Sequence, residues 1–119
     1  MTQSISFFVD GNPVPKQSYR AVHGGGYTDP RVKAWSKLVS DVAMKNMMGK
    51  SMFTGLITIE LQFFLSDRRR KDWDNLSKGV CDALNGIVYK DDSQIERATI
   101  EKAYSKDEPG VYVLVEGQE

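Results

Sequence analysis

A chain of 119 residues fits one domain, residues 1–119, whose hydrophobic core needs no disulfide or structural metal. Its 16 basic and 16 acidic residues cancel, which argues against a simple nucleic-acid-binding module but not against an enzyme whose carboxylates bind divalent cations. A single cysteine, no signal-like start and no apolar run of membrane-spanning length predict a cytoplasmic protein without internal disulfides or membrane contact.

The first third of the chain predicts a strand followed by an irregular loop. Residues 4–9 are β-branched and aromatic, which is typical of a strand, and the two prolines and the glycine of residues 10–15 end it. Lys16 and Arg20 follow, separated by hydroxyl and amide side chains. This composition suits phosphate binding, and it equally suits a solvated loop.

A helix is predicted next. Thr28-Asp29-Pro30 combines a capping side chain with proline in the first turn, which is typical of a helix start. Apolar residues then recur at helical spacing as far as Met47, and Gly49 is a plausible C-terminal stop.

The second half of the chain predicts three more strands and a second helix. Residues 55–65 alternate apolar and polar side chains, residues 74–85 carry an apolar helical face that ends at Asn85-Gly86, and residues 94–104 and 111–116 read as strands. We therefore expect an α+β (mixed α/β) fold in a single domain. It should contain one small mixed sheet of about four to five strands and two main helices.

Acidic and basic residues gather between the third predicted strand and the second predicted helix. Four consecutive bases precede Asp72 and Asp74, which lie about 6.6 Å apart on one face if the backbone is extended. Asp91 and Asp92 follow the helix, and a crossover helix is an ordinary way to bring such ends into one region. Carboxylates without histidine or cysteine favour Mg²⁺, or Mn²⁺, over zinc.

Each of these features also has a purely structural interpretation. Asp74 suits a helix cap, and Lys78 is spaced to form a surface pair with Asp82. Trp73 lies between the two acids and so faces away from them, which favours core packing over base stacking. A run of four bases is most often only solvated.

The order of these residues resembles a known family. Asp72-Trp73-Asp74-Asn75-Leu76-Ser77-Lys78, preceded by four bases and followed by Asp91-Asp92, resembles the RusA-type Holliday-junction resolvases. Gly11-Asn12-Pro13-Val14-Pro15-Lys16 is similar to the Gly-x-Pro-x-Pro-Lys loop of many phage and prophage members. The similarity of length and order covers nearly the whole chain.

The resemblance implies a homodimeric endodeoxyribonuclease of DNA recombination and repair, which binds four-way junctions and nicks two strands symmetrically. It implies that Asp72, Asp74 and Asp92 are the catalytic acids and that Lys78 is the motif lysine. Asp91 matches the first acid of the later pair, as a ligand or a positioning group.

Our hypothesis from the sequence is hydrolysis of a DNA phosphodiester by a water molecule that Mg²⁺ activates. The backbone phosphates would be held by Lys16, Arg20, Arg68, Arg69, Arg70 and Lys71. Two alternatives stay open. One is a metal-dependent nuclease for other branched DNA, such as flaps or forks, and the other is a catalytically inactive phage DNA-binding protein.

Overall fold

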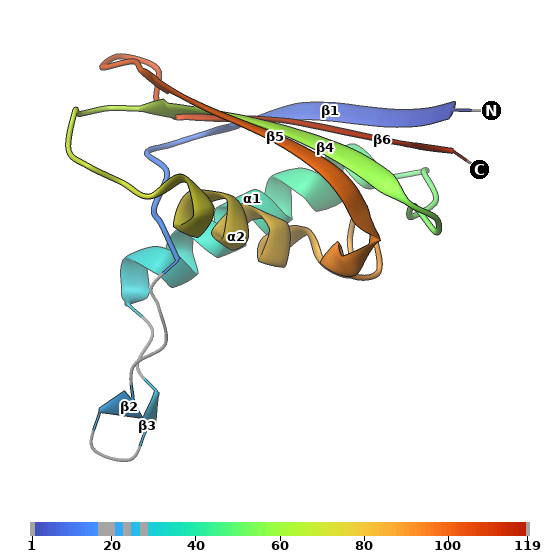
Figure 1. Cartoon of the computed structure of the whole chain (residues 1–119), viewed down its shortest axis with the longest axis horizontal. Helices are drawn as coiled ribbons and strands as arrows, with labels where there is room; N and C mark the ends of the chain where they lie inside the picture. The colour runs from blue at the N-terminus through green and yellow to red at the C-terminus, as the bar shows by residue number, and fades with distance from the viewer. Residues whose placement is uncertain (1, 17–20, 23–24, 27–28, 119) are drawn as a thin grey trace.

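The computed structural model describes residues 2–118 except 17–20, 23–24 and 27–28. It contains two long helices, a short 3-10 helix and two sheets (Figure 1). The helices are α1 (Pro30–Met47), α2 (Trp73–Leu84) and η1 (Asp92–Gln94). The strands are β1 (Thr2–Asp10), β2 (Ala21–Val22), β3 (Gly25–Gly26), β4 (Ile57–Leu65), β5 (Ile95–Tyr104) and β6 (Gly110–Gln118).

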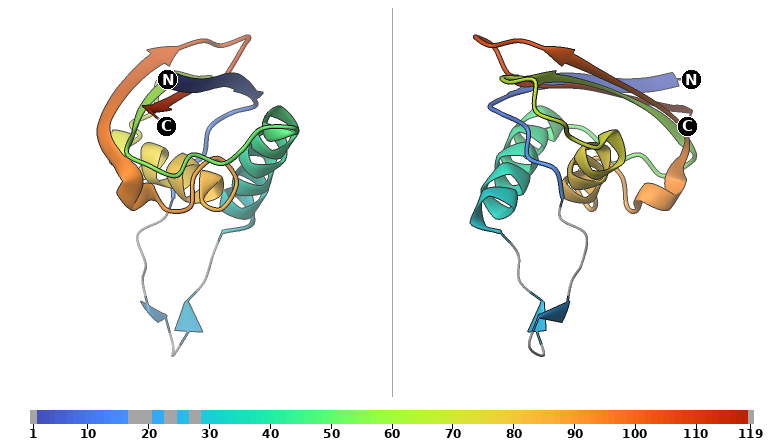
Figure 2. Two further views of the ribbon diagram at one scale, coloured as in Figure 1. Left: turned by 90° about the vertical axis from the view of Figure 1, so that its right-hand side faces the viewer. Right: turned by 60° about the vertical axis from the view of Figure 1, so that its left-hand side comes forward.

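The main sheet has four strands in the order β1-β6-β4-β5. β6 pairs antiparallel with both β1 and β4, whereas β4 and β5 run parallel and are connected through α2. Both α1 and α2 lie against the same face of this sheet (Figure 2). The predicted α+β fold, with one mixed sheet and two main helices, is confirmed.

The hydrophobic core lies between the sheet and the two helices. Alternate residues of β4, from Ile57 to Leu65, are buried, as the period of two in the sequence predicted. The helices contribute one buried stripe each: Trp35, Val39, Ala43 and Met47 from α1, and Leu76, Val80, Ala83 and Leu84 from α2. None of the described helices has the length and apolarity needed to cross a bilayer.

The segment after α2 also enters the core, which its sequence did not predict. Tyr89 is fully buried, and its hydroxyl donates a hydrogen bond of 2.8 Å to the carbonyl oxygen of Cys81. A buried hydroxyl needs a hydrogen-bond partner, and here the partner is a carbonyl oxygen of α2. The bond therefore holds the segment after α2 against the helix. The position of the downstream residues is therefore fixed by packing.

The two edges of the main sheet differ. β1 carries buried residues on its inner face, namely Ile5, Phe7 and Val9. β5 lies at the other edge, pairs only with β4 among the described strands, and is exposed along most of its length. β2 and β3 form a separate two-stranded pair below the helices in Figure 1. Arg20, predicted to bind DNA, lies outside the described residues.

Candidate active site

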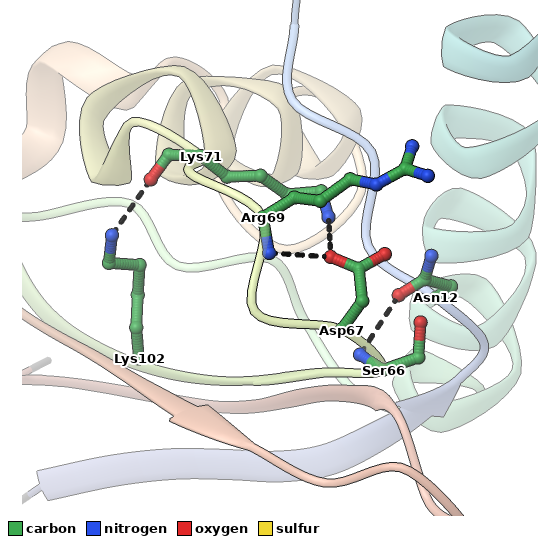
Figure 3. A network of polar contacts seen from close by, with 6 residues as sticks. All are labelled: Asn12, Ser66, Asp67, Arg69, Lys71 and Lys102. Atoms are coloured by element: carbon green, nitrogen blue, oxygen red, sulfur yellow. Dashed lines mark hydrogen bonds and ion pairs between the residues drawn. The ribbon is translucent and has the colours of Figure 1, made fainter.

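The loop between β4 and α2 is held in place by its own carboxylate, Asp67 (Figure 3). The Asp67 Oδ1 atom accepts hydrogen bonds from the Arg69 backbone N–H at 2.9 Å and from the Lys71 ammonium at 3.4 Å. The backbone bond is the first reason that the pKa of Asp67 lies below its ordinary value of 3.8, and Lys71 adds to it. Asp67 is therefore a loop-organising residue.

Two other elements tether the same loop (Figure 3). The Asn12 side-chain oxygen accepts a hydrogen bond of 3.3 Å from the Ser66 backbone N–H. The Lys102 ammonium, near the C-terminal end of β5, donates to the Lys71 carbonyl oxygen at 2.8 Å. The start of α2 is thus positioned next to the C-terminal ends of β4 and β5.

The four consecutive bases do not share one environment. The Arg68 guanidinium lies 4.3 Å from the centre of the Tyr104 ring, a cation–π contact. The Lys71 side chain is mostly covered and is paired with Asp67. Arg69 and Arg70 line a cavity of about 380 Å³ next to the tethered loop.

Helix α1 adds a base that the sequence analysis missed. Arg31 lines the same cavity as Arg69 and Arg70, and Asp29 holds its guanidinium through a 2.9 Å ion pair. In the sequence, the only feature that could have indicated a role for Arg31 is its position directly after the Asp29-Pro30 helix start. The tertiary fold, and not the sequence spacing, brings it next to the basic run.

Asp72 and Asp74 stand at the N-terminal end of α2, and both are exposed. Asp72 occupies the capping position, but its side chain makes no capping hydrogen bond. Asp74 lies within the first turn, where its Oδ1 atom accepts a bond of 2.9 Å from the Asn75 backbone N–H. The structural alternative, in which Asp74 caps the helix, therefore does not hold, because Asp72 occupies the capping position and α2 begins at Trp73.

Lys78 is exposed on α2, one turn after Asp74, and forms no ion pair with any described residue. The alternative pairing of Lys78 with Asp82 does not occur, because Asp82 is paired with Lys16. Lys16 also donates its backbone N–H to the Asn75 carbonyl oxygen at 2.9 Å. The loop after β1 thereby runs along α2.

Trp73, the first residue of α2, is 58% exposed. The prediction that Trp73 packs in the core is therefore wrong. The alternation argument assumed an extended backbone through residue 74, whereas the helix already begins at Trp73. A large aromatic side chain consequently stands in solvent between the two acids.

Asp91 and Asp92 form a second acidic pair in and before η1. Asp91 caps η1 and accepts a 2.7 Å hydrogen bond from the Ser93 hydroxyl. Gln94 fixes this turn to the residues before β4, since its amide donates to the carbonyl oxygens of Phe53 and Gly55 at 3.0 and 2.9 Å. Partial burial, followed by the charges of Asp91 and Asp82, raises the pKa of Asp92.

The two acidic pairs lie at opposite ends of α2. Asp72 begins the helix, whereas Asp92 lies next to Asp82 in its last turn, and ten residues of helix span about 15 Å. The crossover helix runs back along the strands that it connects. It therefore starts at the C-terminal end of β4 and finishes near the N-terminal end of β5. The described residues contain no group of three or more acidic, histidine or cysteine side chains arranged to hold a metal ion.

Comparison with known proteins agrees with this arrangement of motifs. A family model described as endodeoxyribonuclease RusA matches residues 10–116. The chain belongs to the RusA family. The matched residues include both acidic pairs, Lys78 and the basic run of this RusA-family chain.

A curated relative has the same extent. The chain is 28% identical to the uncharacterized protein YqaN of Bacillus subtilis (strain 168), over 93% of this chain and 94% of that protein. The match spans both proteins almost end to end. It adds no information on activity beyond the family assignment.

Proposed function

We propose that this RusA-family chain is a Mg²⁺-dependent, structure-specific endonuclease that resolves four-way DNA junctions by paired symmetric nicks. The observation that supports the proposal is the pair Asp72 and Asp74 at the start of α2: both are exposed, and the Asp72 side chain makes no capping hydrogen bond. They stand directly after a loop whose bases face solvent or a cavity. Acids for a cation and bases for phosphates are thus adjacent.

The donor chemistry fits Mg²⁺ or Mn²⁺, because the candidate ligands are all carboxylate oxygens. One chain supplies these donors in two separate pairs. We therefore assign Asp72 and Asp74 of one chain, with Asp92 and neighbouring Asp91 of a second copy, as the residues that would hold the metal. A homodimer would contain two such sites related by its two-fold axis, as two symmetric nicks require.

When bound, the divalent cation supplies an activated water and stabilises negative charge on the phosphate. The chain's own residues complete the chemistry. The Lys78 ammonium, one helical turn from Asp74 and free of any ion pair to a described residue, is available to neutralise charge on the scissile phosphate.

The bases of the cavity would hold the junction backbone. Arg31, Arg69 and Arg70 come from two elements and surround one cavity, an arrangement suited to phosphate oxygens. Arg68 is positioned by Tyr104, and Lys71 by Asp67. These contacts recognise the DNA backbone and carry no base preference.

The decisive test is a cleavage assay on a synthetic mobile four-way junction, with linear duplex, flap and fork DNA as comparison substrates. We expect Mg²⁺-dependent paired nicks in the junction and at least tenfold slower cleavage of the other substrates. Faster cleavage of flaps or forks would assign the site to other branched DNA. Junction binding without cleavage, together with no stoichiometric Mg²⁺ uptake in calorimetry, would make the chain a binding protein.

A further inference from the structure

Trp73 is a large apolar side chain that stands in solvent directly between two of the proposed metal ligands. Asp72, Trp73 and Asp74 are consecutive at the start of α2, and all three are exposed, Trp73 at 58%. Single exposed apolar side chains are common on protein surfaces and need no explanation by themselves. Its position beside the candidate active site distinguishes Trp73 from the others.

The Trp73 ring has no aromatic or cationic partner in the part of the chain that the structure describes. There, the aromatic pair is Phe8 with Phe64, and the cation–π contact joins Arg68 to Tyr104. The other tryptophan of the chain, residue 35, is only 4% exposed and belongs to the buried stripe of α1. Of the two tryptophans, Trp73 alone has a ring that is open to a ligand.

The backbone that carries Trp73 is held on both sides. The Leu76 backbone N–H donates to the Asp72 carbonyl oxygen at 3.1 Å and closes the first turn of α2. Before the helix, the Lys71 carbonyl oxygen accepts a hydrogen bond of 2.8 Å from the Lys102 ammonium. A tryptophan side chain has few rotatable bonds, so on a fixed backbone it loses little freedom when it binds a partner.

Helix geometry directs the Trp73 side chain toward the basic loop. The Cα–Cβ bonds of a helix tilt toward its N-terminus, so the first side chain of α2 extends past the end of the helix. The buried residues of α2 begin one turn later, at Leu76. Trp73 therefore projects from the end of α2 at which the loop with the four bases, residues 68–71, enters the helix.

A phosphate held near the two acids brings its neighbouring base within reach of this ring. The Cα atoms of Asp72 and Asp74 each lie about 3.8 Å from that of Trp73, because the residues are consecutive. Successive phosphates of one DNA strand are spaced by about 3.4 Å along the duplex axis. The base next to the scissile phosphate is therefore within about one side-chain length of the Trp73 backbone.

An unpaired base can accept such a contact, whereas a base inside a duplex cannot. A stacked base pair has both faces covered, and unstacking it has a free-energy cost that is smallest where the base is already unpaired. Every base has a π face, so stacking on an aromatic side chain discriminates poorly among the four bases. An aromatic ring at this position consequently responds to DNA structure more than to DNA sequence.

We propose that the Trp73 ring stacks on an unpaired base next to the phosphate at Asp72 and Asp74, and that this contact makes the chain prefer branched DNA to linear duplex. The inference deepens the proposed function and rests on it for the identity of the ligand. The basic side chains bind phosphates, which duplex and junction share. Trp73 supplies the preference for an unpaired base that these bases cannot supply.

Junction affinity of Trp73 variants is the first test, in an Asp74→Asn background that should bind DNA without cutting it. Truncating an aromatic side chain that stacks on a base weakens binding by about five- to 150-fold. Trp73→Ala should therefore raise the Kd for a four-way junction about tenfold and leave the Kd for linear duplex within about twofold. Unchanged duplex binding also shows that the variant is folded.

Conservative variants separate stacking from apolar bulk. Trp73→Phe keeps a π face and should retain most of the junction affinity. Trp73→Leu keeps the apolar character without a π face and should bind junctions as weakly as Trp73→Ala. Met48→Ala is the matched control, because Met48 is 78% exposed at the C-terminal end of α1 and should not contact DNA.

Removal of the base identifies the contact itself. A series of junctions carries an abasic residue at one branch-point position after another, in two opposite strands. At one position, base removal should weaken junction binding about tenfold when Trp73 is present and have little effect in Trp73→Ala. Such non-additivity is the signature of two groups that touch. Additive effects at every position would overturn the inference.

Tryptophan fluorescence reports the stacking directly. Trp73 supplies the solvent-exposed emission and Trp35 the buried emission. Junction DNA should quench the exposed component and protect it from acrylamide, and linear duplex should have a much smaller effect. In Trp73→Phe only Trp35 emits, and neither DNA should change its emission.

The outcomes distinguish this inference from the proposed function. If the chain cuts junctions but Trp73→Ala keeps the wild-type ratio of junction to duplex affinity, the inference is overturned and the proposed function stands. If junction DNA quenches Trp73 and the affinity series behaves as expected, but the wild type never cuts, the nuclease proposal fails and the base contact stands. Loss of acrylamide access at high protein concentration without DNA would assign the ring to a protein contact and would also overturn the inference.

Discussion

Lys16, in the loop that follows β1, forms an ion pair with Asp82 in the last turn of α2. The pair connects a loop that the sequence predicted to bind phosphate to α2, the helix that separates the two acidic pairs. Lys16 is therefore already engaged, and DNA can use it only by opening the pair. Its first role in the folded chain is to hold the loop against α2.

Removing this ion pair should weaken the fold slightly. Both side chains are about one-third exposed or more, at 43% and 32%, so we expect Lys16→Met to lower the free energy of unfolding by about 0.5–1 kcal/mol. Urea denaturation measures this change. The double variant K16M/D82N should cost less than the sum of the single variants. Strict additivity would show that the two residues do not interact.

Asp72→Asn and Asp74→Asn should each lower the rate of junction cleavage at least about a hundredfold, because each removes a carboxylate from the proposed metal ligands. Folding should be unaffected, since both residues are exposed. Single-turnover cleavage and junction binding are measured side by side. Weak binding with a normal rate at saturation would contradict the assignment. Asp41→Asn on α1 is a surface control.

Asp92→Asn should abolish cleavage and yet stabilise the fold near neutral pH. Burial and the neighbouring Asp91 and Asp82 raise the pKa of Asp92 in the folded state. The protonated form is thus favoured, and stability falls as pH rises from below 3.8 through the raised pKa. Asparagine cannot ionise and therefore avoids this loss of stability. Urea denaturation at pH 7 and pH 3 should show the gain only at pH 7.

Asp67→Asn should loosen the loop before α2. The pKa of Asp67 is lowered in the folded state, first by the Arg69 backbone bond and also by Lys71, so its contribution exists above pH 3.8 and is lost as pH falls. The variant should therefore bind junctions more weakly at pH 7 and lose less stability than the wild type on acidification. Unchanged junction affinity would show that the loop needs no carboxylate anchor.

Arg70→Ala and Arg31→Ala should weaken junction binding without changing the cleavage rate at saturation. Both side chains line the cavity beside the loop, and each is proposed to bind one DNA phosphate. Removing either base should therefore reduce the slope of log affinity against log salt by about one. Fluorescence anisotropy at several salt concentrations measures the slope. Lys45→Ala, on an exposed part of α1, should leave it unchanged.

Local patterns predicted most of the fold. The apolar stripes of α1 and α2 and the alternation of β4 depend on near neighbours in sequence, and the structure confirms them. The spacing of Asp72 and Asp74 was interpreted on an extended backbone, whereas α2 already begins at Trp73. What the sequence did not predict depends on tertiary packing. Tyr89 is buried from an irregular segment, and Arg31 joins the basic run across a cavity.

The placement of Asp92 shows the same limit. The sequence indicated that a crossover helix lies between Asp74 and Asp92. It did not indicate that this helix runs the length of the strands and so places the two residues at opposite ends. The exact start of α2 also matters. Because the helix begins at Trp73, the Trp73 side chain points into solvent and not into the core. Both differences arise from where α2 begins and how it runs.

The separation of the acidic pairs along α2 has a consequence for a chain that has just been synthesised. Carboxylates about 4 Å apart repel by roughly 4 kcal/mol per pair at an effective dielectric near 20, and a lone chain keeps Asp72 and Asp74 a helix length away from Asp92. In the proposed homodimer, repulsion between these two acidic pairs would arise only when two folded copies meet. If the proposed site needs both copies, active nuclease would form at low abundance in proportion to the square of the chain concentration.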